Sequence, residues 1–358
     1  MTVSHQPKLT INLSALAQNW RLLNGLSALG SAAVVKANAY GLGVEACAPK
    51  LRDAGASRFF VATLSEGRTV RETLGEGPWI GVLEGLSEVA AFEKYSLTPV
   101  LNTLEQIKGW RGHDQATIHV DTGMNRLGLQ PQEVAEGVTS DTWKNAKTAI
   151  LMSHLASAEE PENPSNAAQL KAFREAMASA SNREFIPSLI NSSGHFLGDD
   201  YLKIGMGRPG LALYGGNPTP DAAENPMNPV VQLHAPLIQL RTVEAGAPVG
   251  YGGTWVAQRE SHLGVIPLGY ADGWPRAASD RVMVRLGQSL CPQVGRVSMD
   301  TAVLDLTDAP AALRRIGEPV EVIGGDLTVD RFAQGARTIS YEILTSLSRR
   351  AKRAYLSH

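Results

Sequence analysis

Short apolar runs alternate with amphipathic segments through the first two thirds of the chain. The apolar runs predict buried strands at Lys8–Asn12, Ala32–Val35, Arg58–Thr63, Trp79–Leu83, Leu97–Leu101, Ala116–Asp121, Thr148–His154 and Glu184–Ile190. Amphipathic patterns between them predict helices, among them one after Asn12 and others at Ser65–Leu74, Ser87–Tyr95 and Asn166–Ser181. Repeated strand–helix units predict a parallel sheet. About eight units favour a closed (β/α)8 barrel over an open doubly wound sheet, since no Gly-x-Gly-x-x-Gly follows an early strand.

The pattern changes after a Pro- and Asn-rich stretch at residues 218–229, which is typical of a linker. Apolar runs then follow one another with few helical patterns between them. They predict strands at Val231–Val243, His262–Leu268, Val282–Leu286, Gln293–Leu306 and Val320–Ile323, and a last helix at Ser340–Tyr355. We therefore expect a barrel over residues 8–228 and a mainly-β domain over residues 229–358. Residues 1–12 are also a candidate for pairing with the β domain instead of the barrel.

One lysine, Lys36, ends the apolar run Ala32–Val35 and precedes a turn-like segment that contains Gly41 and Gly43. A lysine at the end of a buried strand is poorly hydrated, so its pKa falls and its amine becomes nucleophilic. Such an amine can form a Schiff base with a carbonyl group. A lysine whose stem is buried and whose charge reaches solvent is the ordinary alternative.

Several polar groups also follow predicted barrel strands. They are Asp121–Arg126 (DTGMNR), His154, Asn191–Gly194 (NSSG) and Arg208–Gly210 (RPG). In a barrel of this kind, active-site groups lie at the carboxyl ends of the strands. The sequence therefore predicts that these groups and Lys36 share one candidate site.

Composition excludes several other classes of protein. An apolar fraction of 43% and a charged fraction of 19% are ordinary for a globular enzyme, and a net charge of −2 gives no sign of a nucleic-acid partner. Cys47 and Cys291 lie far apart, without the spacing of metal ligands, which fits a reducing compartment. No secretory signal and no apolar run long enough to cross a bilayer are found. We expect no metal, no membrane partner and a cytoplasmic location.

Eight motifs extend these observations over nearly the whole chain. They are VVKANAYG, HVDTGMNRLG, SHLASAE, INSSG, RPGLALYG, LGYADGWPR, VGRVSMD and TISYE. In this order and at these intervals they resemble the motifs of alanine racemases that depend on pyridoxal phosphate (PLP). The resemblance implies an isomerase that interconverts L- and D-alanine. D-alanine would serve peptidoglycan synthesis, or both enantiomers would serve alanine catabolism.

The resemblance also implies roles for individual residues. Lys36 would hold the cofactor as a covalent aldimine and act as one base, and Tyr270 would act as the second base on the opposite face of the substrate. His154 and Arg208 would link that tyrosine to the cofactor. Arg208 would face the pyridine nitrogen, where a permanent cation disfavours protonation and so favours racemisation over transamination.

The remaining implied contacts concern the cofactor and the substrate carboxylate. The cofactor-binding positions would be Lys36, Tyr40, Asn191, Ser192, Arg208, Gly210, Leu211 and Tyr341. Arg126 and the amide of Met299 would bind the substrate carboxylate. In this family the residues at the positions of Tyr270 and Met299 act at the partner subunit's cofactor, so the resemblance implies a homodimer with shared sites.

One position departs from the family. Many members have a carbamylated lysine seven residues before the arginine that matches Arg126, and this chain has His119 there. Imidazole forms no stable carbamate. Either neutral His119 accepts a hydrogen bond from Arg126, or an anion such as chloride binds between them. The second is our prediction.

Four other functions compete with alanine racemisation. A broader racemase acting on serine would share every motif quoted. A decarboxylase of the same architecture usually has a carboxylate at the position of Arg208. A non-catalytic PLP carrier on the same barrel would lack the β domain. A generic (β/α)8 enzyme would use Lys36 only structurally and would be colourless.

Overall fold

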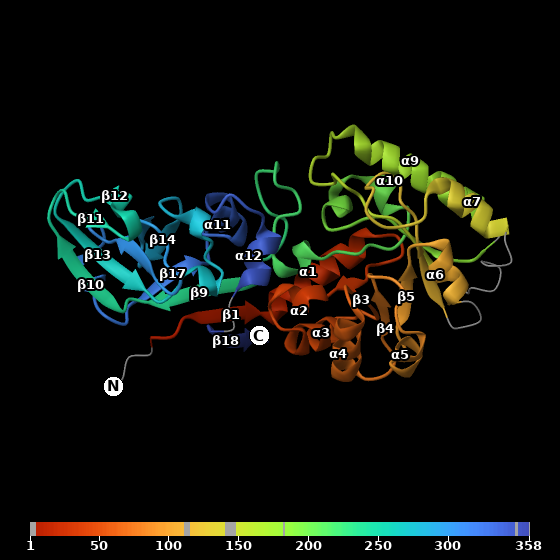
Figure 1. Cartoon of the computed structure of the whole chain (residues 1–358), viewed down its shortest axis with the longest axis horizontal. Helices are drawn as coiled ribbons and strands as arrows, with labels where there is room; N and C mark the ends of the chain where they lie inside the picture. Colours follow the sequence, from red (N-terminus) through yellow and green to blue (C-terminus); the bar gives the residue numbers. More distant parts are fainter. Residues whose placement is uncertain (1–4, 111–114, 140–147, 182, 348–349, 358) are drawn as a thin grey trace.

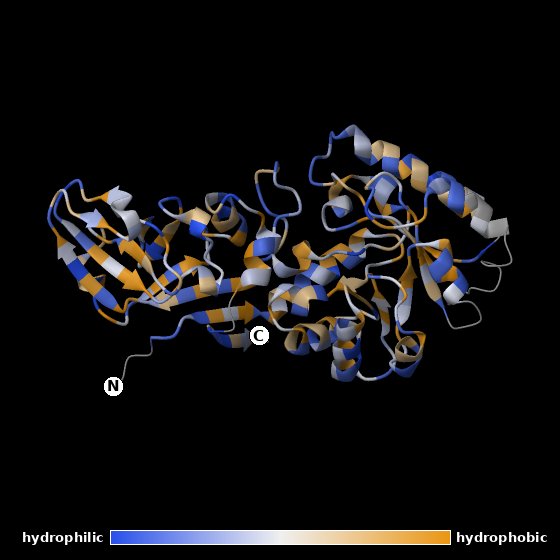
Figure 2. Ribbon diagram, in the orientation of Figure 1, coloured by the Kyte–Doolittle hydropathy of each residue, from blue (hydrophilic) through white to orange (hydrophobic). Residues whose placement is uncertain are grey.

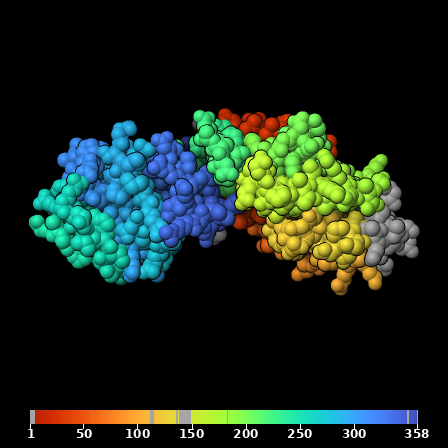
Figure 3. Space-filling view, turned by 90° about the horizontal axis from the view of Figure 1, so that it is seen from above, coloured from red at the N-terminus to blue at the C-terminus, as the bar shows by residue number. Residues whose placement is uncertain are grey.

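The computed structural model describes residues 5–110, 115–139, 148–181, 183–347 and 350–357. It is an elongated molecule in which a barrel of alternating strands and helices lies beside a mainly-β domain (Figure 1). In the space-filling view the blue C-terminal segments lie against the green and red parts of the barrel (Figure 3). Among the described helices, none combines the length and the apolar character needed to cross a membrane.

The barrel sheet has seven parallel strands in chain order. They are β2 (Ala33–Val34), β3 (Arg58–Val61), β4 (Trp79–Val82), β5 (Thr98–Leu101), β6 (Ala116–His119), β7 (Thr148–Met152) and β8 (Ile186–Ser188). Residues 206–209 fill the remaining place between β8 and β2. The Arg208 amide donates to the Ile190 carbonyl (2.9 Å) and the Ala32 amide donates to the Gly207 carbonyl (2.9 Å). The predicted barrel is therefore confirmed, with an irregular segment in place of an eighth strand.

Helices cover the outside of this sheet. They are α1 (Leu13–Leu26), α3 (Val44–Asp53), α4 (Leu64–Leu74), α5 (Val89–Lys94), α6 (Leu104–Gly109), α7 (Pro131–Thr139), α9 (Pro164–Ser179) and α10 (Asp199–Leu202). Polar caps fix where several of them begin: Oδ1 of Asn12 accepts from the Ala15 amide (3.0 Å), and Oγ1 of Thr63 accepts from the Glu66 amide (3.2 Å). The helix predicted after Asn12 is α1, and it buries Leu16, Trp20 and Leu23 along one face.

The second domain is built on a nine-stranded sheet in the order β10-β13-β16-β15-β14-β17-β9-β1-β18. Its strands are β1 (Lys8–Asn12), β9 (Val231–Pro236), β10 (Gln239–Val243), β13 (Ser261–Ile266), β14 (Met283–Leu286), β15 (Ser289–Val294), β16 (Ala302–Asp305), β17 (Pro319–Ile323) and β18 (Lys352–Leu356). A small hairpin of β11 (Pro248–Val249) and β12 (Trp255–Val256) and the helices α11 (Val329–Gly335) and α12 (Ser340–Ser346) complete it. Apolar and polar residues alternate along several of these strands, as expected for a sheet with one buried face (Figure 2).

Strand β1 ties the two parts together. It pairs antiparallel with β9 and parallel with β18, and α1 of the barrel follows it directly. Leu9 and Ile11 are fully buried. Residues 8–12 therefore belong structurally to the β sheet although they precede the barrel in sequence, while residues 1–4 lie outside the described part.

Three predicted elements are wrong. The helix expected at Ser340–Tyr355 ends at Ser346, and Lys352–Leu356 forms β18, because pairing with β1 at the other end of the chain overrides the local helical pattern. Residues 348 and 349 lie outside the described residues. The strand expected at Gln293–Leu306 is interrupted between Val294 and Ala302, and the strand expected at Val231–Val243 divides into β9 and β10.

Candidate active site

A cavity of about 720 Å³ opens at the carboxyl ends of the barrel strands. Of the residues predicted from the sequence, it brings together Lys36, Tyr40, His119, Arg126, His154, Asn191, Ser192, Arg208, Gly210, Leu211 and Tyr341. Lys36 follows β2, His119 ends β6, and His154 follows β7. Tyr270 and Met299 do not line this cavity.

Lys36 opens a one-turn left-handed helix, α2 (Lys36–Tyr40). Ala37, Asn38, Ala39 and Tyr40 all have φ between +52° and +56°, and Gly41 follows with φ +82°. The lysine side chain is half-buried. Burial lowers the pKa of Lys36, the Arg126 cation lowers it further, and the Glu66 carboxylate acts in the opposite direction. The larger neutral fraction of amine that follows suits a nucleophile and a base.

Arg208 is held rigidly inside the barrel and is only 4% exposed. Its Nη1 donates to Oγ of Ser188 (2.5 Å), and its Nη2 donates to the Ser153 carbonyl (2.5 Å). Burial lowers the pKa of Arg208 to about 9, which leaves the guanidinium charged at neutral pH. The barrel therefore presents a fixed cation at the cavity wall.

His154 lies next to this cation. Nη2 of Arg208 is 3.3 Å from Nδ1 of His154. Burial, followed by the Arg208 charge, holds the pKa of His154 well below its usual value, so the ring is neutral. Because a guanidinium can only donate, Nδ1 is the acceptor and Nε2 carries the proton.

A group of hydrogen-bond donors surrounds Gly210. Oγ of Ser192 accepts from the amides of Gly210 (3.0 Å) and Ala212 (3.2 Å), which draws this loop together. A Cβ atom at Gly210 would collide with the Tyr40 hydroxyl, so only glycine lets that hydroxyl approach the loop.

Two tyrosines close to Gly210, Tyr40 and Tyr341, form an aromatic wall of the cavity. The ring of Tyr40 stacks on Tyr214 at 4.7 Å and lies 6.0 Å from Tyr341. Burial raises the pKa of Tyr40, and burial and the Glu159 charge raise the pKa of Tyr341 to about 12. Both hydroxyls therefore stay protonated and able to donate. Uncharged hydroxyls that can donate, here those of Tyr40, Tyr341 and Ser192, suit a phosphate group beside a glycine that leaves room for it, so these residues fit the phosphate of PLP.

Asn191 has a structural role in the same region. Its Oδ1 accepts from the Gly194 amide (2.9 Å) and its Nδ2 donates to the Leu155 carbonyl (3.3 Å). These bonds fix the loop that carries Ser192 relative to the loop after β7.

His119 is buried and has a defined tautomer. Its Nδ1 lies 2.8 Å from Oδ1 of Asn102, and Nδ2 of Asn102 donates to the Val100 carbonyl (3.0 Å). The oxygen of Asn102 thus faces the ring, so Nδ1 donates and Nε2 is left as an acceptor. Burial, Arg208 and Arg126 lower the pKa of His119 to about 4, which keeps it neutral.

Arg126 lies at the tip of a closed loop. Oδ1 of Asp121 accepts from the amides of Gly123, Met124 and Asn125 at 2.9–3.1 Å. The Leu129 amide donates to the His119 carbonyl (2.8 Å), which closes the base of the loop. Among the described residues Arg126 has no hydrogen-bond partner, so its guanidinium can bind a ligand at the cavity.

Tyr270 and Met299 lie together at a different place, in two exposed loops of the β domain. They are 44% and 53% exposed. The Tyr270 amide donates to the Ser298 carbonyl (3.1 Å), and the Ala271 amide donates to the Met299 carbonyl (3.0 Å). The structure therefore joins these two residues to each other and not to the Lys36 cavity of the same chain.

Arg350 fixes these loops, and the sequence analysis missed this role. Its Nε and Nη2 donate to the two carboxylate oxygens of Asp272 (2.8 and 2.9 Å), and its Nη1 donates to Asp300 (2.6 Å). No local signal identifies this contact, since the arginine is about fifty residues or more from both carboxylates in sequence. No group of three or more His, Cys, Asp or Glu side chains suited to a metal occurs among the described residues.

Comparisons with known proteins agree with this geometry. Residues 11–218 match the sequence model of the alanine racemase N-terminal domain, and residues 230–355 match that of the alanine racemase C-terminal domain. The chain is 44% identical to an alanine racemase of Methylobacterium sp. (strain 4-46), covering 99% of both chains. It is 43% identical to a catabolic alanine racemase of Agrobacterium fabrum, covering 97% of this chain and 92% of the relative.

One solved structure has the same fold over almost the whole length of the chain. Alanine racemase from Bartonella henselae, with covalently bound pyridoxal phosphate, superposes with a TM-score of 0.92 at 36% identity, covering 99% of this chain and 100% of that one. With both domain models matched in order over almost the whole sequence, the chain belongs to the alanine racemase family.

Proposed function

We propose that the protein is a PLP-dependent alanine racemase whose cofactor is bound to Lys36. One observation carries this proposal: a half-buried lysine with a lowered pKa shares a cavity with a fixed guanidinium, Arg208, and a group of phosphate-binding donors. When bound, PLP withdraws electrons from the substrate and makes its α-proton removable. Residues of the chain supply the bases, the binding of the substrate carboxylate and the orientation of the cofactor.

Two bases on opposite faces of the substrate are needed to invert its configuration. The Lys36 amine serves one face, because its lowered pKa leaves it able to accept a proton. Tyr270 serves the other. Neutral His154 and charged Arg208 extend a hydrogen-bonded path from the cavity wall toward that second base, and Arg208 disfavours protonation of the pyridine nitrogen.

Tyr270 reaches the substrate only in a homodimer with shared sites. This proposal is supported by the position of Tyr270, which is exposed on the β domain beside Met299 and does not line the Lys36 cavity of its own chain. Leu127, Ile339 and Tyr341 leave exposed apolar surface at the rim of that cavity. A second copy that covers this rim with its β domain would bury both patches and complete two sites.

The substrate carboxylate binds to Arg126 and to the amide of Met299 of the partner subunit. His119 Nε2, left as an acceptor by the bond from Nδ1 to Asn102, is the group that we propose accepts a hydrogen bond from Arg126 once the substrate binds. The bound anion that the sequence suggested stays the alternative. A neutral imidazole with no N–H toward the cavity gives such an anion little attraction.

The β domain with Tyr270 and Met299 speaks against a non-catalytic carrier, and Arg208 speaks against a decarboxylase. Serine as an additional substrate stays open. Both D-alanine supply for peptidoglycan and alanine catabolism fit the chemistry. The division of the chain at residues 228 and 229 and a cytoplasmic location also stay proposals, the latter supported by the free thiols of Cys47 and Cys291.

Proton NMR in deuterium oxide tests the proposed function. The purified protein with PLP and L-alanine should replace the α-proton with deuterium and produce D-alanine in a chiral assay, and Lys36→Ala should do neither. Retention of the α-proton by the wild-type protein would overturn the proposal. The same run with serine measures substrate breadth.

A further inference from the structure

The turn that carries Lys36 needs to be held in place from outside. Four consecutive non-glycine residues, Ala37–Tyr40, have left-handed backbone angles. That conformation brings Cβ close to the following carbonyl oxygen and is unfavourable for every residue except glycine. Backbone hydrogen bonds within the turn, from the Ala39 amide to the Val35 carbonyl (2.9 Å) and from the Gly41 amide to the Ala37 carbonyl (2.7 Å), offset part of this strain. Contacts with the rest of the barrel add to them.

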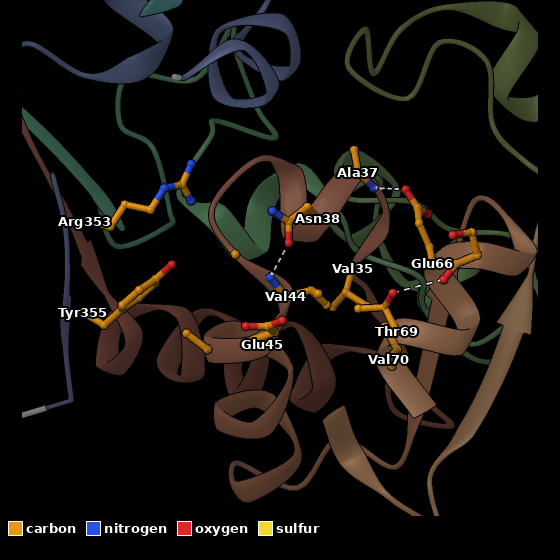
Figure 4. Close-up of a pocket in the computed structure, with 13 residues that line it drawn as sticks. Val35, Ala37, Asn38, Val44, Glu45, Glu66, Thr69, Val70, Arg353 and Tyr355 are labelled. Atoms are coloured by element: carbon orange, nitrogen blue, oxygen red, sulfur yellow. Dashed lines mark hydrogen bonds between the residues drawn. The ribbon is translucent and has the colours of Figure 1, made fainter. Parts of the chain in front are cut away.

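Packing leaves one side of the turn uncovered. A cavity of about 850 Å³ lies behind it and is lined by Val35, Asn38, Glu66, Arg353 and Tyr355, among others (Figure 4). Polar contacts must therefore stabilise this side. At the far end of the turn, Oδ1 of Asn38 accepts from the Val44 amide (2.8 Å).

The near end, next to Lys36, is held by one carboxylate. Oε1 of Glu66 accepts from the Ala37 amide (2.8 Å; Figure 4). Its Oε2 accepts from the Ala62 amide (2.8 Å). Glu66 thus connects the start of the turn to the residue that follows β3. Hydrogen bonds to an ionised acceptor are about twice as strong as neutral ones.

Capping of α4 does not account for this arrangement. In a capping box the glutamate at this position would bind the amide of the N-cap residue, Thr63. Glu66 instead binds the preceding residue, Ala62, and reaches across to the turn. Its charge also raises the pKa of Lys36, against burial and Arg126.

We propose that Glu66 is a positioning residue, whose carboxylate holds the left-handed turn and so directs the Lys36 amine into the cavity. The proposal rests on the proposed function only in taking Lys36 as the cofactor lysine. No role in proton transfer is assigned to Glu66.

Glu66→Gln tests this proposal. A carboxamide keeps the size of the side chain but has one oxygen, so one of the two amides loses its acceptor and the charge is removed. Hydrogen exchange of the holoenzyme, followed by mass spectrometry, should show at least about tenfold faster exchange in residues 37–43. The pH transition of the bound cofactor's visible absorbance should move to lower pH.

Two variants of the same helix are matched controls. Glu72→Gln removes an exposed carboxylate that pairs with Arg68 and should change neither readout. Thr63→Ala removes the cap of α4 and should lower the melting temperature without moving the pH transition. The proposal would be overturned if Glu66→Gln showed the wild-type rate of hydrogen exchange in residues 37–43 and the wild-type pH transition of the cofactor's absorbance.

If Glu66→Gln does not fold, Glu66→Asp takes its place. Aspartate keeps the charge but is too short to bridge both amides. Exchange in residues 37–43 should then rise while the pH transition stays, and unchanged exchange would overturn the proposal. If the wild-type protein binds PLP but racemises nothing, the proposed function fails and the exchange comparison still decides the role of Glu66.

Discussion

Arg208 lies 3.3 Å from His154, with its Nη2 directed at Nδ1 of the ring, and this contact fixes the tautomer of the imidazole. The guanidinium is a buried cation bound to a hydroxyl and a carbonyl oxygen, and burial before all else keeps the imidazole neutral. The imidazole is neutral and presents its proton on Nε2. The pair is therefore a fixed donor system at the wall of the cavity.

Replacing Arg208 with Gln should lower kcat for racemisation about 100-fold, because a preorganised cation is lost from the cavity. With a neutral side chain at this position the pyridine nitrogen can be protonated, so transamination should rise. Pyruvate release during turnover of alanine measures this side reaction. An unchanged ratio of pyruvate to racemised product would contradict the role given to Arg208.

Replacing Arg350 with Gln should impair both stability and turnover. Asp272, with a side chain only 5% exposed, loses its bidentate partner, so the free energy of unfolding should fall. The loops of Tyr270 and Met299 lose their common anchor, so kcat should fall about tenfold even where the protein is folded.

Arg285→Gln is the matched control for Arg350. Arg285 pairs with Glu321 and Asp326 in the same domain but does not contact the two loops. Its loss should lower the free energy of unfolding in urea and leave kcat per folded molecule unchanged. Equal kinetic effects of the two substitutions would refute the positioning role of Arg350.

The buried His119 predicts a loss of stability in acid. Its pKa is lowered to about 4 in the folded protein, from the ordinary histidine value of 6.5. Between these pH values the unfolded state binds more protons, so the free energy of unfolding falls as pH falls, and His119 contributes about 3 kcal/mol to this fall. Urea unfolding at pH 7 and near pH 4 measures it. His119→Asn should show a shallower pH dependence, and an identical one would contradict this account.

Replacing Tyr270 with Phe removes the proposed second base without emptying its space. Deuterium exchange of the α-proton should slow about 100-fold or more from one enantiomer, L-alanine by analogy with the family, while the colour of the bound cofactor persists. Tyr201→Phe, on α10 of the barrel, is a tyrosine control. Equal loss of exchange from both enantiomers would argue against separate faces for the two bases.

The sequence predicted most of the barrel because its signals are local. Strand–helix alternation and the motifs around Lys36, Arg126 and Arg208 each lie within a few residues, and the structure gathers them in one cavity. What the sequence did not show depends on contacts between distant segments. Strand β18 exists because Lys352–Leu356 pairs with Lys8–Asn12, and its own residues suggested a helix.

Contacts between distant segments also explain why the sequence did not indicate the roles of some residues at the site. Glu66 follows Thr63 in a pattern typical of helix capping, and nothing local indicates that its carboxylate reaches Ala37. Asn102 decides the tautomer of His119 from the neighbouring strand, seventeen residues away. Such contacts arise only when the barrel closes.

Subunit complementation tests the central claim, that Lys36 of one chain and Tyr270 of its partner form one site. Lys36→Ala and Tyr270→Phe, each nearly inactive alone, are unfolded together, refolded together and assayed for racemisation. Half of the randomly assembled dimers are mixed, and each has one intact site of two, so activity should return to about one quarter of wild type. No recovery in refolded mixed dimers would show that both bases act from the same chain and would contradict the account.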